Sequence, residues 1–529
     1  MIKLKSETET PSRRSRLPRL FVLLVLVVFA ILLLEKCLGH WALSRWKSRM
    51  AAQGEVFEAD RLWPQPTAQG RAFSNQMQQA IAQLHPGLNR YAGLVSGFLV
   101  QEPGLARRGS QEPSPVLNPS RDGTNTWEDL AQQIRQAQPV LQSLQRILTH
   151  PPADNGGEIL PRLEHLSRPS FVDLRRAAQG LQAATMSDLH CGGLEGAKEN
   201  LVALAAITRV YADDPTLVNY MIHIAVLGLS IEAAWDALQA DGWTDAQLAD
   251  LQQAFQCDQL LAQMPRAIAA QRASQLYELQ WFSSHSYLAW VGRFQSLYEA
   301  IGHPIPNADA PDALVTRYFR QWVFHPVWKF AWADEEQLEY LEQVQKELDI
   351  LRAAVKTGSG YELSQRLDSY LKAYRPPLAC WRFYLALPWM DQSSEGFGAW
   401  RDKREYPYAD FTRAWSISMK NLTLGQMVTA VIALKRYEAR YGKAPVTLDT
   451  LVPEFLAQVP RDLMDGQPLR YRLNTDGSFT FYSVGEDGQD GGGDPSTADS
   501  DKDWQNKPPW AGRDWVWPRA VADAKACAR

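Results

Sequence analysis

The pattern of hydrophobic and polar positions changes twice along the chain. Residues 20–34 read LFVLLVLVVFAILLL, without a polar side chain. From residue 41 to residue 410, apolar residues recur every three or four positions, which is the period of an amphipathic helix. After residue 415 a short stretch of alternating residues follows one more helical segment. The fold class predicted is mainly α: an N-terminal transmembrane helix, a large helical body and a small C-terminal α+β module with an antiparallel sheet.

The apolar run is the strongest single signal. Residues 20–34 make about 22 Å of helix, against a hydrocarbon core of about 30 Å. Extending the helix over residues 17–39 makes it long enough to span the core. We therefore predict a basic cytoplasmic tail at residues 1–19 and a transmembrane anchor at residues 20–39, with the lipid bilayer as its partner.

Basic residues lie on both sides of the anchor, with a modest excess before it. This bias predicts a cytoplasmic N-terminus and a body on the outer side of the membrane. A cleaved signal peptide, cut near residues 42–44, is one alternative, and a buried core helix is another. The basic residues are Lys3, Lys5, Arg13, Arg14, Arg16 and Arg19 before the run, and Lys36, Arg45, Lys47 and Arg49 after it.

The helical body at residues 41–410 is divided by turn signals. Breaks are expected at residues 191–193, at residues 213–215 and at Gly242, after which Thr244 suits a helix N-cap. Short links between helices predict antiparallel neighbours, in a bundle or in a stack of α-hairpins. Pro and Ser cluster at residues 101–125, where an exposed loop is expected.

Two groups in the second half of the body bear on function. Three tryptophans could form a ligand platform, but we expect them to pack in the core. Five carboxylates could supply an acid/base pair, but their position in the first turns of a helix predicts solvent exposure. The groups are Trp322, Trp328 and Trp332, and Asp334, Glu335, Glu336, Glu339 and Glu342.

Motifs for common reactions are absent from the sequence. It contains neither H-E-x-x-H nor G-x-S-x-G, and its five cysteines have no spacing suited to zinc. Their pairing is left open. The net charge of −4 gives no basic surplus for nucleic acid. The pair His190 and Cys191, near Asp188, is the most suggestive cluster, but adjacent residues on a helix point apart. We assign no catalytic residue.

The C-terminal module, residues 415–520, has a recognisable order of elements. A helix runs from Trp415 to Tyr441 and should end at Gly442. Two alternating runs around residues 474–477 predict a β-hairpin, and an acidic loop follows at residues 485–503. Beyond the loop, DWVWPR predicts a short strand that packs back on the sheet.

The stretch ALKRYEARYGKAPVTLDTLVPEFLAQVPRDLMDGQPLRYR, followed by FYSVGEDGQDGGG, resembles the C-terminal part of the G-type major pseudopilins of type II secretion. The resemblance covers residues 419–503. It implies a long helix, a small antiparallel sheet and a last loop that binds calcium. The whole order of anchor, helical body and tail resembles a group of large bacterial single-pass membrane proteins. The matching positions are Gly442, Pro445, Pro460, Asp462, Pro468 and Tyr471.

By this resemblance, Asp487, Asp499 and Asp501 are the expected calcium ligands, with backbone carbonyls of Ser483 or Val484. Calcium takes six to eight oxygen ligands, which carboxylates and turned-in carbonyls supply. An EF-hand is excluded, because Trp504 and Trp510 occupy its glycine and glutamate positions. The alternative is an acidic loop that holds no ion.

These features together predict an envelope protein anchored in the bacterial inner membrane, with its body in the periplasm. Its expected role is structural or partner-binding, and its partners are other envelope proteins rather than nucleic acid. An accessory component of a secretion or pilus-like system is one alternative. An envelope enzyme with a site in a groove of the helical body is another.

Overall fold

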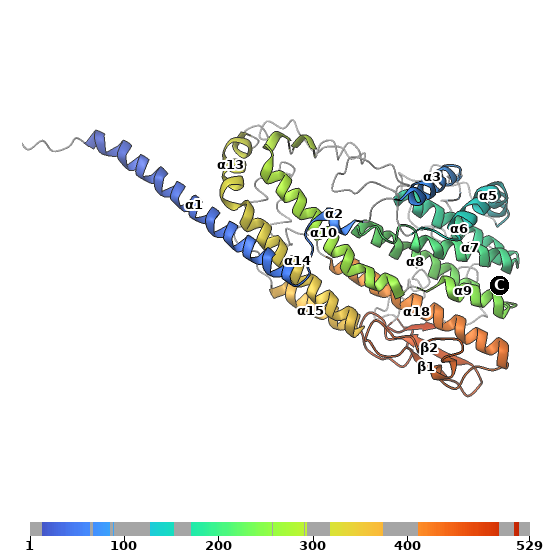
Figure 1. The fold of residues 1–529 in the computed structure, drawn as a ribbon. Coiled ribbons are helices and arrows are strands. Elements are labelled where there is room, and N and C mark those ends of the chain that lie inside the picture. The colour runs from blue at the N-terminus through green and yellow to red at the C-terminus, as the bar shows by residue number, and fades with distance from the viewer. Residues whose placement is uncertain are drawn as a thin grey trace, which may run out of the picture. The chain divides into compact units, whose positions relative to one another are not determined.

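In the computed structural model the chain is mainly helical and carries a small antiparallel sheet (Figure 1). Two compact units are formed: unit 1 comprises Met1–Phe57, Arg272–Lys346 and Tyr374–Ala409, and unit 2 comprises Glu58–Gln271, Glu347–Ala373 and Asp410–Arg529. The structure describes residues 13–63, 67–84, 88, 127–152, 171–256, 258–289, 291–293, 318–373, 411–496 and 513–517. The loop predicted at residues 101–125 lies outside these ranges.

Unit 1 contains the helix α1 (Arg13–Ala52) and a set of helices that form an aromatic core. The later part of α1 becomes amphipathic: Gly39, Leu43 and Trp46, spaced four and three residues apart, are buried on one face. The other elements are the end of α10 (Asp258–Ser284), two π-helical turns η3 (Arg320–Phe324) and η4 (Trp328–Trp332) around α13 (His325–Val327), and the start of α14 (Ala333–Thr357).

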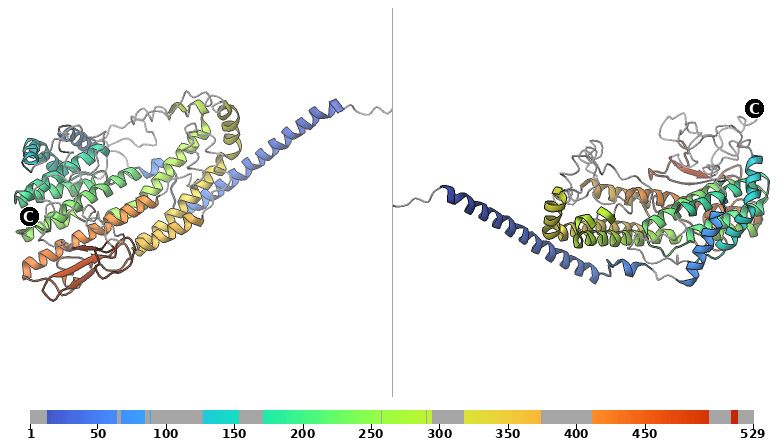
Figure 2. Two further views of the ribbon diagram at one scale, coloured as in Figure 1. Left: turned by 180° about the vertical axis from the view of Figure 1, so that it is seen from behind. Right: turned by 90° about the horizontal axis from the view of Figure 1, so that it is seen from above.

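Unit 2 is a set of packed helices with the sheet module at its C-terminal end (Figure 2). Helix α6 packs against α5, α7 and α8, and α18 packs against α8 and α9. The helices are α2 (Ala59–Leu62), α3 (Ala68–Ala82), α5 (Trp127–Leu148), α6 (Phe171–His190), α7 (Leu194–Ala206), η2 (Ile207–Arg209), α8 (Leu217–Ala237), α9 (Asp245–Ala254), α15 (Gly360–Ala373), α18 (Thr412–Tyr441) and η5 (Leu448–Leu451).

The expected helix boundaries in this unit are confirmed. Helix α6 ends at residue 190 and α7 starts at residue 194, and the second break separates η2 from α8. Thr244 caps α9, where its hydroxyl accepts from the backbone N–H of Gln247 while the Gln247 side chain reciprocates. This capping box satisfies N–H groups that the first helical turn leaves open.

Helices α8 and α18 meet closely at a glycine. A Cβ on Gly228 would come within 3.2 Å of the Asn421 side chain, a tight contact that the absent side chain of glycine avoids. The Asn421 amide donates to the Ile224 carbonyl over 2.9 Å. Most residues of α8 are buried, apart from a stripe that includes Val218 and Ala225, so its apolar composition fits a position inside unit 2.

The sheet has the order β1-β2-β3 and is antiparallel throughout. Strand β1 (Arg470–Leu473) and β2 (Phe479–Ser483) form the predicted hairpin, in register Arg470 with Tyr482, and Gly477 takes a φ of 84° in its turn. Strand β3 (Trp515–Trp517) pairs with β2. This pairing confirms that the strand packs on the sheet, and its Trp517 ring also contacts the Trp235 ring of α8 edge-on, with the ring centroids 3.9 Å apart.

Two expectations for the body are wrong in part. The core assignment holds for Trp328, which is fully buried, but Trp322 is 67% exposed. Solvent exposure is wrong for Glu336, which is fully buried, and Asp334 forms an ion pair with Lys36 at 2.7 Å. The reason is that the first turns of α14 lie within unit 1, beside α1, and not on its free surface.

Among the residues that the structure describes, three helices are long and apolar enough to cross a membrane: α1, α8 and α18. The apolar window of α1 has no buried residue, whereas more than half of the corresponding windows of α8 and α18 are buried. The apolar side chains of α8 and α18 are therefore used in packing within unit 2. The apolar window of α1 is not buried by packing.

Candidate functional site

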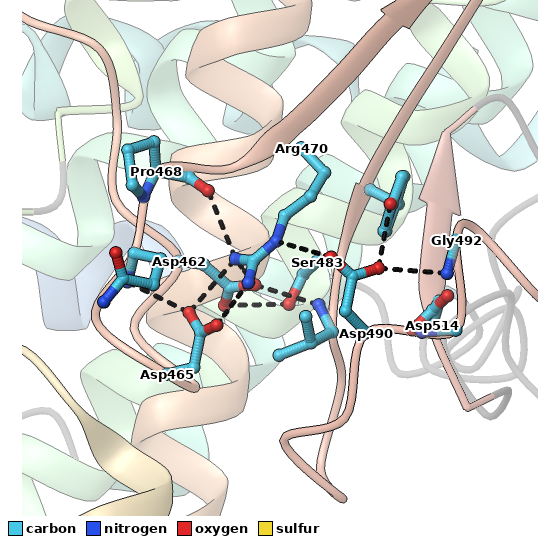
Figure 3. Close-up of polar contacts among 12 residues, drawn as sticks. Asp462, Asp465, Pro468, Arg470, Ser483, Asp490, Gly492 and Asp514 are labelled. Atoms are coloured by element: carbon cyan, nitrogen blue, oxygen red, sulfur yellow. Dashed lines mark hydrogen bonds and ion pairs between the residues drawn. The ribbon is translucent and has the colours of Figure 1, made fainter.

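The polar centre of the C-terminal module is built around Asp462, in the loop before β1 (Figure 3). The loop is closed by its own backbone: Asp462 N donates to the Gln467 carbonyl, and Gly466 N donates to the Asp462 carbonyl, both over 2.7 Å. Gly466 has a φ of 79°, in the left-handed region that favours glycine. The tight turn directs the Asp462 carboxylate toward the end of β2.

The Asp462 carboxylate is fully buried and accepts several hydrogen bonds. The Ser483 hydroxyl donates to Oδ1 and the Val484 N–H to Oδ2, each over 2.9 Å. The Met464 N–H donates to Oδ1 over 3.0 Å. Burial raises the pKa of Asp462, and these hydrogen bonds to the carboxylate oppose the rise. The side chain thereby fixes the end of β2 to the loop before β1.

Arg470, the first residue of β1, is surrounded by three carboxylates. Its guanidinium lies 3.4 Å from Asp462 and 3.4 Å from Asp490, and it pairs with Asp465 through two nitrogens. The hydrogen bond to Asp465 is the main cause that raises the pKa of Arg470. The Gly492 N–H, above all, lowers the pKa of Asp490. The guanidinium of Arg470 therefore lies at the centre of this acidic cluster.

Asp514, next to β3, holds the front of the acidic loop. It is fully buried, and its carboxylate accepts from the backbone N–H groups of Gly491, Gly493 and Asp494, at 3.3, 2.7 and 2.8 Å. Its own N–H donates to the Asp494 carbonyl over 3.0 Å. The loop between β2 and residue 496 is thus fastened to β3 by hydrogen bonds from its own backbone.

The predicted calcium ligands are only partly described. Asp487 lies in an exposed turn, where its Oδ1 accepts from the Gln489 N–H over 2.9 Å. Asp499 and Asp501 lie outside the described residues, within residues 497–512. Among the residues that the structure describes, no group of three His, Cys, Asp or Glu side chains is arranged to hold a metal ion.

The chemistry of the donors limits what calcium could use here. Asp462 and Asp490 face Arg470, and Asp514 is occupied by backbone N–H groups. Glu486 pairs with Lys420, and Asp494 accepts from Ser496. Asp487 is the one predicted ligand in the described part of the loop, and a single carboxylate falls short of the six to eight oxygens that calcium takes. A calcium site therefore depends on Asp499 and Asp501.

If those residues complete a site, millimolar calcium will raise the melting temperature of the detergent-solubilised full chain. A ligand at one hundred times its dissociation constant stabilises the folded state by about 2.7 kcal/mol. Asp487→Ala should reduce the shift, and Asp449→Ala, at an exposed position in η5, should preserve it. A melting temperature unchanged by calcium in the unaltered chain would remove the ion from this loop.

The cluster Asp188, His190 and Cys191 lies at the end of α6. The His190 ring stacks on Trp127 at 4.2 Å, and Cys191 is an exposed free thiol. Asp188 accepts from the Asn200 amide over 2.9 Å. Burial raises the pKa of Asp188 to about 6. The hydrogen bond from Asn200 opposes this rise in part, and the nearby Glu199 charge adds to it. The cluster joins α6 to its neighbours through Asn200, which also accepts from Gln145 over 2.9 Å.

The raised pKa of Asp188 predicts a pH dependence of stability. Between about 3.8 and about 6 the folded state binds the extra proton, so this contribution to stability is present below that window and is lost as pH rises through it. Thermal melting of unit 2 in the full chain at pH 4, 5, 6 and 7 should show the loss. Asp188→Asn should flatten this part of the profile, whereas Asp250→Asn, on the exposed side of α9, should not.

A groove of about 830 Å³ lies beside α5, α7 and α9 within unit 2. Its charged side chains include Lys198, Asp250 and Arg209. Lys198 forms ion pairs with Glu195 at 2.6 Å and with Asp250 at 3.4 Å, and the Arg209 guanidinium donates to the Ala254 carbonyl. These side chains are thus engaged in contacts within and between helices.

No protein-family model, curated protein or solved structure matches this chain. The resemblance to pseudopilins therefore stays a prediction from the sequence. In the structure two of the matching positions are in contact: the Tyr471 hydroxyl donates to the Pro445 carbonyl over 2.6 Å. Gly442 ends α18 with a φ of 67°. Sequence reasoning included Asp462 as a matching position, but it did not identify Arg470 or Asp514, because the turns that bring their partners close are not evident from the sequence.

Proposed function

We propose that this chain is a single-pass membrane protein of the bacterial envelope, whose units outside the bilayer have a structural or partner-binding role. The observation that supports the proposal is the exposure of the apolar side chains of α1. Apart from the half-buried Leu32, its large apolar side chains between Leu20 and Leu34 are 44–67% exposed within the chain itself. A helix that is apolar on every face and leaves its side chains uncovered is suited to lipid.

The continuation of α1 into unit 1 favours an anchor that is kept. Leu43, in the middle of the stretch where a signal peptidase would cut, is 6% exposed and packs in unit 1. The helix runs without a break from Arg13 to Ala52, so residues 42–44 have no extended backbone to offer a peptidase. Both features support an uncleaved helix.

Burial within unit 2 favours a single pass. Ile224 and Leu227 of α8 and Val431 and Leu434 of α18 are at most 3% exposed. To place these helices in lipid, unit 2 would lose the packing that buries them. The excess of basic residues before α1 favours a cytoplasmic N-terminus.

Two arginines in the anchor test the proposal. Leu24→Arg with Val28→Arg should move much of the protein from the alkali-resistant membrane pellet to the supernatant, because each arginine costs about 3 kcal/mol at a helix centre in the bilayer. The matched control places arginines at Val172 and Val446, which are exposed in unit 2. An unaltered chain extracted by alkaline carbonate would contradict the proposal.

Orientation is read in the same cells from Cys191, an exposed thiol of unit 2. A membrane-impermeant maleimide should label the chain in intact spheroplasts, and Cys191→Ser should reduce the label. Labelling of Cys191 only after lysis would place unit 2 on the cytoplasmic side and refute the topology.

A role as an accessory of a secretion or pilus-like system is a second candidate. The contact between Tyr471 and Pro445, at two positions of the pseudopilin pattern, favours it. Affinity purification of the full chain from crosslinked membranes should then recover pseudopilins. Tyr471→Phe, which removes the hydroxyl of this contact, should weaken the recovery, and a preparation free of pseudopilins would exclude the role.

A further inference from the structure

The helical segment at Arg320–Trp332 in unit 1 presents two different faces. Its inner face contributes Phe324 and Trp328 to the aromatic core, where they meet Phe282 and Tyr287. The Phe282 and Trp328 rings lie 4.7 Å apart. The core of this part of unit 1 is therefore completed by one face of the segment.

The other face is apolar and exposed. We call it the aromatic face, and it consists of Tyr318, Phe319, Trp322, Val323 and Phe330, with exposures of 63%, 51%, 67%, 49% and 38%. A soluble surface seldom gathers large apolar side chains in this way, and such patches mark sites of interaction with protein or lipid. Packing among the described residues of unit 1 leaves these side chains largely exposed, although Phe330 contacts Phe29.

Contacts with α1 show which residues of α1 lie beside this segment. The Phe330 ring stacks on Phe29 at 5.9 Å, whereas Trp332 Nε1 donates to Glu35 over 2.6 Å. Lys36 pairs with Asp334 at 2.7 Å. Phe29 precedes Glu35 by six residues, or about 9 Å of helix, and lies within the apolar run. Polar contacts thus occur where the apolar run ends, and the aromatic contact occurs inside it.

We propose that the aromatic face is inserted in the outer part of the lipid bilayer, beside α1. The proposal rests on the proposed anchoring by α1: once Phe29 is in lipid, Phe330 lies at the same depth. Trp and Tyr are the residues enriched where the hydrocarbon core meets the headgroups. Lys329, exposed beside Phe330, donates from Nζ to the Ser284 carbonyl over 3.1 Å, and an exposed cation next to apolar side chains suits the headgroup region.

Lipid suits this face better than a soluble protein does. A partner that covered Phe330 would have to enter the bilayer next to α1, because the stacking on Phe29 fixes Phe330 to the apolar run. Lipid is already present at that depth. Unit 1 is then held to the membrane at two points, α1 and the aromatic face.

Site-directed spin labels on the full chain test the proposal. All five cysteines are replaced by serine, and single cysteines are introduced by Trp322→Cys, Leu24→Cys and Glu342→Cys. Leu24 is in the apolar run, and Glu342 is exposed on α14, about 12 Å of helix beyond Asp334. In vesicles of phosphatidylethanolamine and phosphatidylglycerol, the accessibility of each nitroxide to oxygen is compared with that to a water-soluble nickel chelate.

At position 322, the ratio of oxygen to nickel accessibility should approach that at position 24 and exceed that at position 342 severalfold. A ratio at 322 equal to that at 342, with position 24 in lipid, overturns this inference and leaves the anchor intact. A water-exposed label at position 24 overturns both. A label at 322 hidden from both reagents shows a protein cover, such as a second copy, and also overturns it. Val323→Cys repeats the measurement on the same face should the Trp322 variant fold poorly.

Discussion

Replacing Asp462 with alanine is expected to destabilise the C-terminal module by about 3–5 kcal/mol. The buried carboxylate accepts from Ser483, Val484 and Met464 and lies beside Arg470. Its removal leaves backbone N–H groups without an acceptor and Arg470 with one carboxylate fewer, and each loss of this kind costs about 1–3 kcal/mol. Hydrogen–deuterium exchange of the full chain, read on peptides covering β1 and β2, gives the change in opening free energy.

Two further variants separate lost hydrogen bonds from lost charge. Asp462→Asn keeps one acceptor oxygen and should fall between the alanine variant and the unaltered chain. Asp449→Ala is the matched control, because Asp449 is exposed in η5 of the same module and should change stability by less than about 0.5 kcal/mol. Equal protection of β1 and β2 in Asp462→Ala and Asp449→Ala would show that the Asp462 network does not hold the sheet.

Replacing Arg272 with methionine should destabilise unit 1 by a similar amount, about 3–5 kcal/mol. Arg272 is fully buried, and its guanidinium donates to Glu55 over 2.9 Å and to the Val56 carbonyl over 3.0 Å. It also donates to Gln345 and lies over the Phe57 ring at 4.7 Å. Methionine has similar volume but leaves the Glu55 carboxylate, whose side chain is 9% exposed, without its cation.

The partner variant decides whether the charge is the cause. Adding Glu55→Gln to Arg272→Met should recover much of the loss, because removing both charges of a buried pair is far less costly than removing one. Urea unfolding in detergent, followed for each single variant and for the double variant, gives the coupling energy. Arg352→Met, whose pair with Asp349 at 3.9 Å is exposed, is the control. Losses that simply add in the double variant would contradict the buried-pair explanation.

Local signals explain which parts of the fold could be predicted. The helix end at Gly442 and the hairpin turn before Phe479 depend on residues next to each other in the chain, and both are found where expected. The cluster around Arg470 brings together residues 462, 465 and 490. Nothing in a single sequence pairs such residues, so this centre could not be predicted.

The tryptophans show a second limit. Trp322 and Trp328 are six positions apart, so the period of an α-helix places them on different faces. That period does not say which face meets the core. The π-helical turns at η3 and η4 also add residues to each turn and shift the pattern. Trp322 therefore could not be distinguished from Trp328 by periodicity.

Two ion pairs attach the C-terminal part of α1 to the rest of unit 1, and this attachment has a mechanical consequence. Lys36 is paired with Asp334, and Glu55, just after the helix, is paired with Arg272. Helix α1 runs without a break from the apolar segment to Ala52, where it is already part of unit 1. A helix that is too long or too short for the local bilayer adapts by tilting. If α1 spans the membrane as proposed, such a mismatch would tilt unit 1 together with α1, and membrane thickness would set the inclination of unit 1 to the membrane surface.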